Sequence, residues 1–240
     1  THQLIIIGSG PGGYETAIKA AQNGLSVLII ESDQLGGTCL NHGCIPTKCL
    51  CKNAEFIDGL KHADEYGINI SNTAFNITQA VERKDKIVNQ LASGIETLLK
   101  TNNVSIVKGH ADFVDSHTVS VGNEQFTAEN IIIATGSTTR YLPIPGAQST
   151  NVLTSKEMLH LREVPRKLCI IGGGVIGLEF AAIYNSFGSD VTVIEYCKEI
   201  LPNFDREVAK RLRTSLKKQG IAFKTGARVD CIEDGEHGKV

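Results

Sequence analysis

Four cysteines close together in the sequence could carry redox or metal chemistry. Cys39, Cys44, Cys49 and Cys51 lie in one short stretch, and the chain holds seven cysteines in all. An odd count grouped in this way does not suit the disulfide framework of a secreted protein. A metal site is disfavoured, because the seven histidines are scattered and there is no pair of CxxC motifs. We expect a redox-active thiol pair; the alternative is a coincidental group of buried thiols.

Two thiol pairs fit the spacing equally well, since four residues separate Cys39 from Cys44 and four separate Cys44 from Cys49. Glycines at 36, 37 and 43 favour the first pair, because they let a loop fold back, whereas Cys49 should lie on a helix that begins near Pro46. Cys44 would then lie at the N-terminus of this helix, where the helix dipole favours a thiolate.

An internal repeat must position these thiols. Residues 4–31 and 168–195 align without gaps at 12 of 28 identical positions, with an offset of 164. Each copy reads as an apolar strand, a glycine-rich turn, an amphipathic helix and a second strand that ends in glutamate. This is the opening βαβ of a doubly wound sheet. The repeat predicts an α/β protein with two Rossmann-like nucleotide-binding units.

Both copies carry a GxGxxG turn, which lets the backbone approach a pyrophosphate at a helix N-terminus. Its glycines are Gly8, Gly10 and Gly13 in the first copy and Gly172, Gly174 and Gly177 in the second. Glu31 and Glu195 close the copies, each 23 residues after the first glycine, where an acid accepts hydrogen bonds from a ribose. A carboxylate at Glu195 repels a 2′-phosphate, which favours NAD over NADP. The alternatives are glycine turns kept for packing and a Glu195 that simply ends a strand in solvent.

The other elements are read more coarsely. We expect helices from Pro46 to about Leu60, from Thr78 to Lys100 and from Asp205 to Gln219. Short segments predict a small antiparallel meander in the first unit: Val104–Val107, Ala111–Val114, Thr118–Val121 and Gln125–Thr127. A buried strand should follow over 130–134, with a linker over 141–146 and a strand over 221–224. The predicted domains are residues 1–143 and an incomplete second unit, 144–240.

Composition excludes several classes. The chain has a formal charge of −2, 41% hydrophobic and 21% charged residues, which is ordinary for a globular protein and excludes disorder. A near-neutral balance gives no electrostatic case for nucleic acid or a membrane surface. No apolar run approaches the length of a membrane span, and no signal peptide fits the start. We expect no nucleic-acid or membrane partner and a cytoplasmic protein, or one of the mitochondrial matrix after transit-peptide removal.

Residues 36–48, GGTCLNHGCIPTK, resemble the redox-active disulfide motif of the pyridine nucleotide–disulfide oxidoreductases. Within that family the whole chain is most similar to the dihydrolipoamide dehydrogenases. The resemblance implies an FAD-binding first domain and an NAD-binding second domain. The implied FAD contacts are Gly8, Gly10, Gly13, Glu31, Gly37, Thr38, Lys48, Gly109, Thr135, Gly136 and Ser137. The implied NAD contacts are Gly172, Gly174, Gly177, Glu179, Glu195 and Val229.

The resemblance also implies a reaction. Dihydrolipoamide, carried by a 2-oxo acid dehydrogenase complex, would exchange with a Cys39–Cys44 disulfide, with Cys39 attacking and Cys44 against the flavin. Electrons would pass to FAD and a hydride then to NAD. Lys48 and Glu179 match family positions that pair beside the flavin. Otherwise they are a solvated helix charge and a helix-end acid.

The chain departs from the family pattern in two respects. His42 replaces a residue that is usually apolar, and we expect it to face solvent. The family's C-terminal His-Pro and Gly-Asp pairs do not occur in this sequence. We therefore expect the N-terminal half of a longer, homodimeric enzyme, without the interface domain and inactive by itself. The alternatives are a glutathione or mercuric reductase-like enzyme and a non-catalytic dinucleotide-binding fragment.

Overall fold

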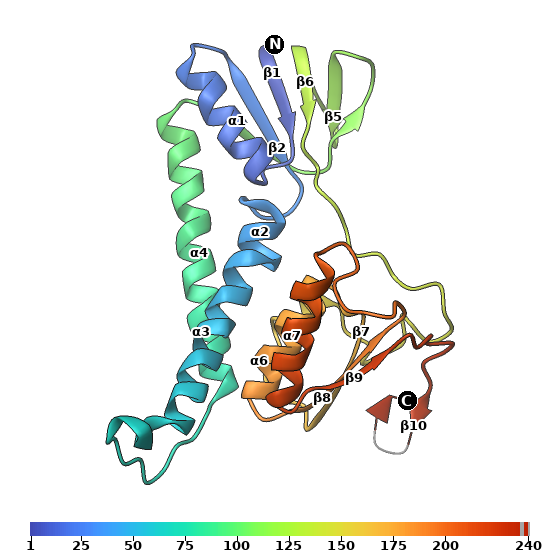
Figure 1. Cartoon of the computed structure of the whole chain (residues 1–240). Helices are drawn as coiled ribbons and strands as arrows, with labels where there is room; N and C mark the ends of the chain where they lie inside the picture. The colour runs from blue at the N-terminus through green and yellow to red at the C-terminus, as the bar shows by residue number, and fades with distance from the viewer. Residues whose placement is uncertain (236–237, 240) are drawn as a thin grey trace. The chain divides into compact units, whose positions relative to one another are not determined.

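The computed structural model describes residues 1–235 and 238–239, which form two compact units (Figure 1). The first unit comprises residues 1–46 and 84–138, and the second comprises 47–83 and 139–240. These ranges differ from the predicted domains because residues 47–83 group with the second unit. Leu50, Ile77 and Val81 share a hydrophobic core with Leu178 and Tyr184, which explains this grouping.

The first unit is built on a six-stranded sheet in the order β3-β2-β1-β6-β5-β4. Its strands are β1 (His2–Ile7), β2 (Val27–Glu31), β3 (Ser105–Lys108), β4 (Asp112–Phe113), β5 (Thr118–Val121) and β6 (Glu124–Ile133). Strands β3, β2, β1 and β6 run parallel, whereas β5 pairs antiparallel with the start of β6 and β4 pairs antiparallel with β5. Its helical segments are α1 (Pro11–Gln22), α2 (Gly37–His42), the first residues of α3 (Cys44–Lys61) and most of α4 (Ile77–Thr101).

Alternation along β1 gives this unit two cores. Leu4 and Ile6 pack in one cluster with Ala17 of α1 and Leu99 of α4. Ile5 and Ile7 pack in another cluster, which includes Val119 of β5. Since side chains of a strand alternate between the two faces of a sheet, a strand buried on both faces has an almost continuous apolar sequence, as β1 does.

The second unit contains a three-stranded parallel sheet, β7-β8-β9, among its described residues. Its strands are β7 (Lys167–Ile171), β8 (Asp190–Glu195) and β9 (Ala222–Thr225), followed by the hairpin β10 (Asp234–Gly235) and β11 (Gly238–Lys239). The helices of this unit are α5 (Ser155–Met158), α6 (Val175–Ser186) and α7 (Arg206–Lys218). It also contains the rest of α3, the 3-10 helix η1 (Ala63–Tyr66) and the start of α4. Figure 1 shows α6 and α7 beside the sheet.

The sequence repeat recurs in the hydrogen bonding. Leu4 pairs with Val27 and Leu168 with Val191, so the offset of 164 preserves the strand register. The N–H of Gly8 donates to the carbonyl of Ile30 at 2.8 Å, and that of Gly172 donates to Ile194 at 2.8 Å. The predicted α/β fold with two βαβ openings is therefore confirmed.

Three local predictions were wrong. Residues 104–107 overlap β3, which pairs parallel with β2 and lies outside the meander, because α4 returns the chain to that edge in the same direction. The predicted strands 125–127 and 130–134 are one strand, β6, whose Ile133 is 65% exposed rather than buried. The glycines at 36, 37 and 43 flank or begin the short helix α2 instead of forming an open loop.

Among the described residues, the structure contains no helix with the length and apolar character of a membrane span.

Two glycine-to-alanine changes within helices of the first unit should act in opposite directions. A Cβ on Gly13 would lie 1.9 Å from the carbonyl oxygen of Gly8, whereas a Cβ on Gly94 meets no described atom within 4 Å. We expect Gly94→Ala to raise the free energy of unfolding by about 0.5–1 kcal/mol through helix propensity. Gly13→Ala should lower it by about 2–3 kcal/mol. Denaturant titration measures both; equal effects would contradict this packing.

Candidate functional site

The first glycine turn presents an open helix N-terminus. Gly8 has φ +101°, and a Cβ there would lie 2.3 Å from the carbonyl oxygen of Ala134. Gly10 precedes α1 in an extended conformation, and no described side chain caps this helix. Pro11 has no N–H, and the N–H groups of Gly13 and Tyr14 donate to the carbonyl of Gly10 at 2.8 and 2.9 Å, so Gly12 supplies the N–H of this first turn that a pyrophosphate would meet.

Glu31 closes this turn from the end of β2. Its Oε2 accepts hydrogen bonds from the N–H of Ser9 at 2.8 Å and from the Ser9 hydroxyl at 2.6 Å. Its Oε1 accepts the N–H of Asp33 at 2.8 Å. Gly109, with φ +150°, donates its N–H to the backbone oxygen of Glu31 at 2.8 Å. The structure therefore brings Glu31 to the turn, places Gly109 beside the backbone of Glu31, and adds Ser9, which sequence reasoning missed.

Two further predicted segments meet the same turn. A Cβ on Gly37 would lie 2.5 Å from the Cα of Gly10, so these backbones touch. The backbone of Thr135 lies next to Gly8, since a Cβ on Gly8 would lie 3.1 Å from the backbone nitrogen of Thr135. Thr38, Thr135, Gly136 and Ser137 are all exposed. The turn has no room for a Cβ at Gly8 or Gly37. Such a glycine backbone suits a ligand that must approach the main chain closely, as the pyrophosphate of FAD does.

The structure forms the Cys39–Cys44 disulfide, with Cα atoms 4.7 Å apart. Cys39 lies within α2 and Cys44 is the first residue of α3, while Cys49 is buried further along α3. A Cβ on Gly43 would lie 3.0 Å from the carbonyl oxygen of Thr38, so a glycine suits this closely packed link. Of the two pairs that the spacing allowed, the first is confirmed.

Asn41 anchors the thiol helix and was not singled out from the sequence. Its side-chain amide donates to the carbonyl oxygens of Gln34, Leu35 and Gly37 at 3.3, 3.0 and 3.1 Å. These bonds hold α2 against the segment that precedes it. The sequence offered one indication of this role, a polar amide between the two cysteines. The residue is only 6% exposed.

His42 follows Asn41, and the prediction that it faces solvent was wrong. Its side chain is 22% exposed, and its Nε2 lies 3.4 Å from Oδ2 of Asp33, which draws the ring against the protein.

The second turn repeats the first. Gly172 has φ +110°, Gly174 precedes α6 without a cap from any described side chain, and a Cβ on Gly177 would lie 2.3 Å from the carbonyl oxygen of Gly172. Backbone close to an open helix N-terminus again fits a dinucleotide pyrophosphate.

Glu195 is 8% exposed, so it does not end β8 in solvent. Its Oε2 accepts the N–H of Gly173 and its Oε1 the N–H of Cys197, both at 2.6 Å. Val229 is half-buried in the irregular segment between β9 and β10. The carboxylate therefore faces the turn, as ribose recognition requires.

Lys48 of α3 and Glu179 of α6 form an ion pair in the second unit. The hydrogen bond that the Lys48 ammonium donates to the Glu179 carboxylate raises the pKa of Lys48. Cys51, one turn further along α3, is half-buried. Burial raises the pKa of its thiol; the Glu179 charge raises it further, and Lys48 opposes this. Neither Lys48 nor Glu179 is an isolated solvated charge.

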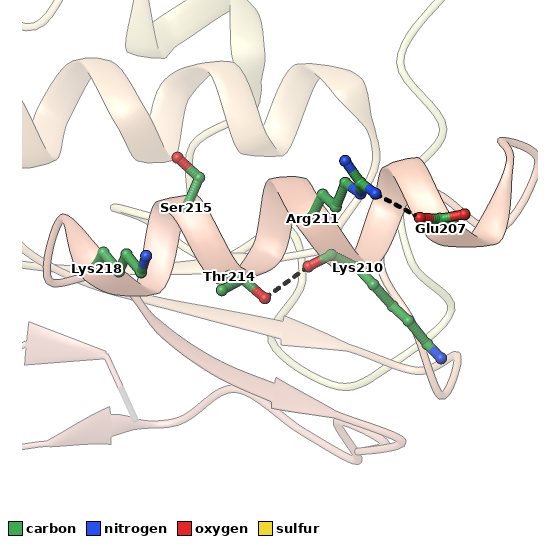
Figure 2. Close-up of a pocket in the computed structure, with 6 residues that line it drawn as sticks. All are labelled: Glu207, Lys210, Arg211, Thr214, Ser215 and Lys218. Carbon is green, nitrogen blue, oxygen red and sulfur yellow. Dashed lines mark hydrogen bonds and ion pairs between the residues drawn. The ribbon is translucent and has the colours of Figure 1, made fainter.

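Figure 2 shows a hollow lined by side chains of α7. Within it Arg211 pairs with Glu207 at 2.7 Å, and the Thr214 hydroxyl donates to the carbonyl of Lys210 at 2.8 Å. All its lining residues belong to one helix, and it includes none of the predicted site residues.

Comparison with known proteins decides the family. A family model described as pyridine nucleotide-disulphide oxidoreductase matches residues 2–240. The chain belongs to this family. It is also similar to dihydrolipoyl dehydrogenases of the same family. The Acholeplasma laidlawii protein is 42% identical over 238 residues, which cover 97% of this chain and 71% of that protein. The Geobacillus stearothermophilus protein is 42% identical over 241 residues, which cover 98% of this chain and 51% of that protein.

A solved family structure agrees with the fold. It is the Cu(II) complex of the HOCl-induced flavoprotein disulfide reductase RclA from Escherichia coli, with a TM-score of 0.87 and 34% identity. The match covers 100% of this chain and 54% of that one. The chain thus spans about half the length of RclA and of several of the dihydrolipoyl dehydrogenases that it matches.

The charges around Cys51 predict opposite effects on its reactivity. Glu179→Gln removes a negative charge and leaves Lys48 unpaired, so the thiol pKa should fall and alkylation below that pKa should become about three- to tenfold faster. Lys48→Gln should slow alkylation by a similar factor. Iodoacetamide labelling, followed by mass spectrometry of the Cys51 peptide, measures both rates. Changes in the same direction would contradict the electrostatic cause.

Proposed function

We propose that the chain supplies the redox disulfide and both nucleotide sites of a dihydrolipoyl dehydrogenase. The reaction moves electrons from dihydrolipoamide, on a 2-oxo acid dehydrogenase complex, through Cys39–Cys44 and FAD to NAD. One observation carries the proposal. Gly37, whose backbone touches the first glycine turn at Gly10, lies only two residues before Cys39 of the disulfide. Relatives at about 42% identity bear this enzyme's name.

The cysteines perform the first step. A thiolate of dihydrolipoamide attacks the sulfur of Cys39, and the S–S bond breaks with Cys44 as the leaving thiolate. The second substrate thiol then displaces Cys39, so the substrate becomes a disulfide and the protein gains two electrons as a dithiol. In the reverse direction the Cys39 thiolate would attack the substrate disulfide, which is the attacking role that the resemblance implies for it. Cys44 begins the long helix α3, whose dipole stabilises its thiolate.

FAD, when bound, would accept these two electrons and pass them to NAD as a hydride. The first glycine turn, Glu31, Gly37, Thr38, Gly109 and residues 135–137 would hold FAD in the first unit. Lys48 and Glu179 are a proposed catalytic pair, in which the carboxylate orients and stabilises the ammonium. The enzyme would work as a homodimer in the cytoplasm.

The surroundings of Glu195 support NAD as the second cofactor. Its buried carboxylate suits a free 2′-hydroxyl and would repel a 2′-phosphate. A 2′-phosphate would need an arginine partner, but Arg213 of α7 already forms an ion pair with Glu199 at 2.8 Å, which compensates its charge. This favours a dihydrolipoyl dehydrogenase over an NADP-dependent reductase of the same family.

Spectroscopy tests the proposal directly. After incubation with FAD and gel filtration, we expect the chain to retain a visible flavin absorbance that dihydrolipoamide bleaches. Cys39→Ser and Cys44→Ser should retain the flavin and bleach at least about a hundredfold more slowly, because the exchanging S–S bond is lost.

Cys49→Ser is the matched control, because this buried thiol lies outside the disulfide. It should bleach like the wild type. A colourless wild-type protein, or disulfide variants that bleach as fast as the wild type, would refute the proposal for this chain. Faster bleaching by NADPH than by NADH would instead assign it to another reductase of the family.

A further inference from the structure

Ser9 is a fully buried residue whose hydroxyl points at the carboxylate of Glu31. Both its N–H and its hydroxyl donate to the same oxygen, Oε2, at 2.8 and 2.6 Å. The N–H of Asp33 donates to the other oxygen at 2.8 Å. Among the described residues, two backbone N–H groups and one hydroxyl thus donate to the carboxylate that is expected to recognise a ribose.

The number of acceptor positions makes this arrangement significant. A carboxylate offers about four lone-pair positions, and three are taken here. A ribose brings two hydroxyl donors, so one protein donor must give way if both are to bind. The N–H groups of Ser9 and Asp33 are fixed in the backbone, whereas the Ser9 hydroxyl can rotate about its C–O bond. Ser9 is therefore the donor that must move.

The second unit lacks this hydroxyl. Gly173 takes the place of Ser9, and a Cβ there would lie 2.9 Å from Ile200 Cγ2 and 3.2 Å from Oε2 of Glu195. Besides two backbone N–H groups, Glu195 has the thiol of Cys197 as a hydrogen-bond partner. A thiol is a weak donor compared with a hydroxyl. A ribose would therefore meet a strong side-chain competitor in the first unit only.

We propose that the Ser9 hydroxyl competes with the adenosine ribose of FAD for Glu31 and lowers the affinity of the first unit for its dinucleotide. The inference rests on the proposed binding of FAD there. It makes Ser9 a determinant of affinity: the hydroxyl stabilises Glu31 in the empty turn and rotates away when the ribose binds.

A flavin fluorescence titration of the wild-type chain and Ser9→Ala tests this. Removing one hydrogen bond to the carboxylate in the empty state should lower the FAD dissociation constant about three- to tenfold. Ser9→Gly, which copies the second unit, should shift it in the same direction and serves if the alanine variant does not fold. The affinity for FMN, which lacks the adenosine ribose, should not change. Cys197→Ala, which removes the weak donor of the other unit, should leave FAD affinity unchanged.

An unchanged or weaker FAD affinity in both Ser9 variants would overturn the proposal, since the hydroxyl would then be neutral or would help to bind the ribose. An equal gain for FMN would also overturn it, as would a failure of the wild type and both variants to bind FAD. If the wild type binds FAD and dihydrolipoamide bleaches it, but neither variant binds more tightly, this inference fails and the proposed function stands.

Discussion

A hydrogen bond between a strand-end carboxylate and the glycine turn of the neighbouring strand organises both units. Glu31 holds the N–H of Ser9 and Glu195 that of Gly173. The bond is possible only because the parallel register places the end of the second strand beside the turn that follows the first. Each carboxylate is thereby fixed next to the N-terminus of a helix that no described side chain caps, which is the arrangement that binding of a pyrophosphate and a ribose at one turn would need.

The disulfide depends on the same arrangement. Gly37 can touch the backbone of Gly10 because neither residue has a side chain, and α2 then carries Cys39 to Cys44 at the start of α3. Asn41 ties α2 to the preceding segment. A cofactor bound along the first turn would therefore lie in the same unit as the disulfide, which is what a relay of electrons from thiols to a flavin requires.

Most of the fold and much of the site could be predicted because their signals are local. Glycine spacing, apolar periodicity and the repeated glutamate each lie within one βαβ unit, and the cysteine spacing lies within one motif. Properties set by distant residues could not be predicted. Strand β3 takes its partner from the return of α4, and residues 47–83 take their unit from packing on α6. The Ser9 hydroxyl bond required knowing which oxygen of Glu31 faces the turn.

The central claim is that each carboxylate belongs to a separate dinucleotide site. Isothermal titration with ADP, which contains the diphosphate and ribose common to both cofactors, tests it most directly. We predict two binding sites per wild-type chain, and one site after either Glu31→Ala or Glu195→Ala. Unchanged stoichiometry in both variants, or a single site in the wild type that neither variant affects, would contradict the account.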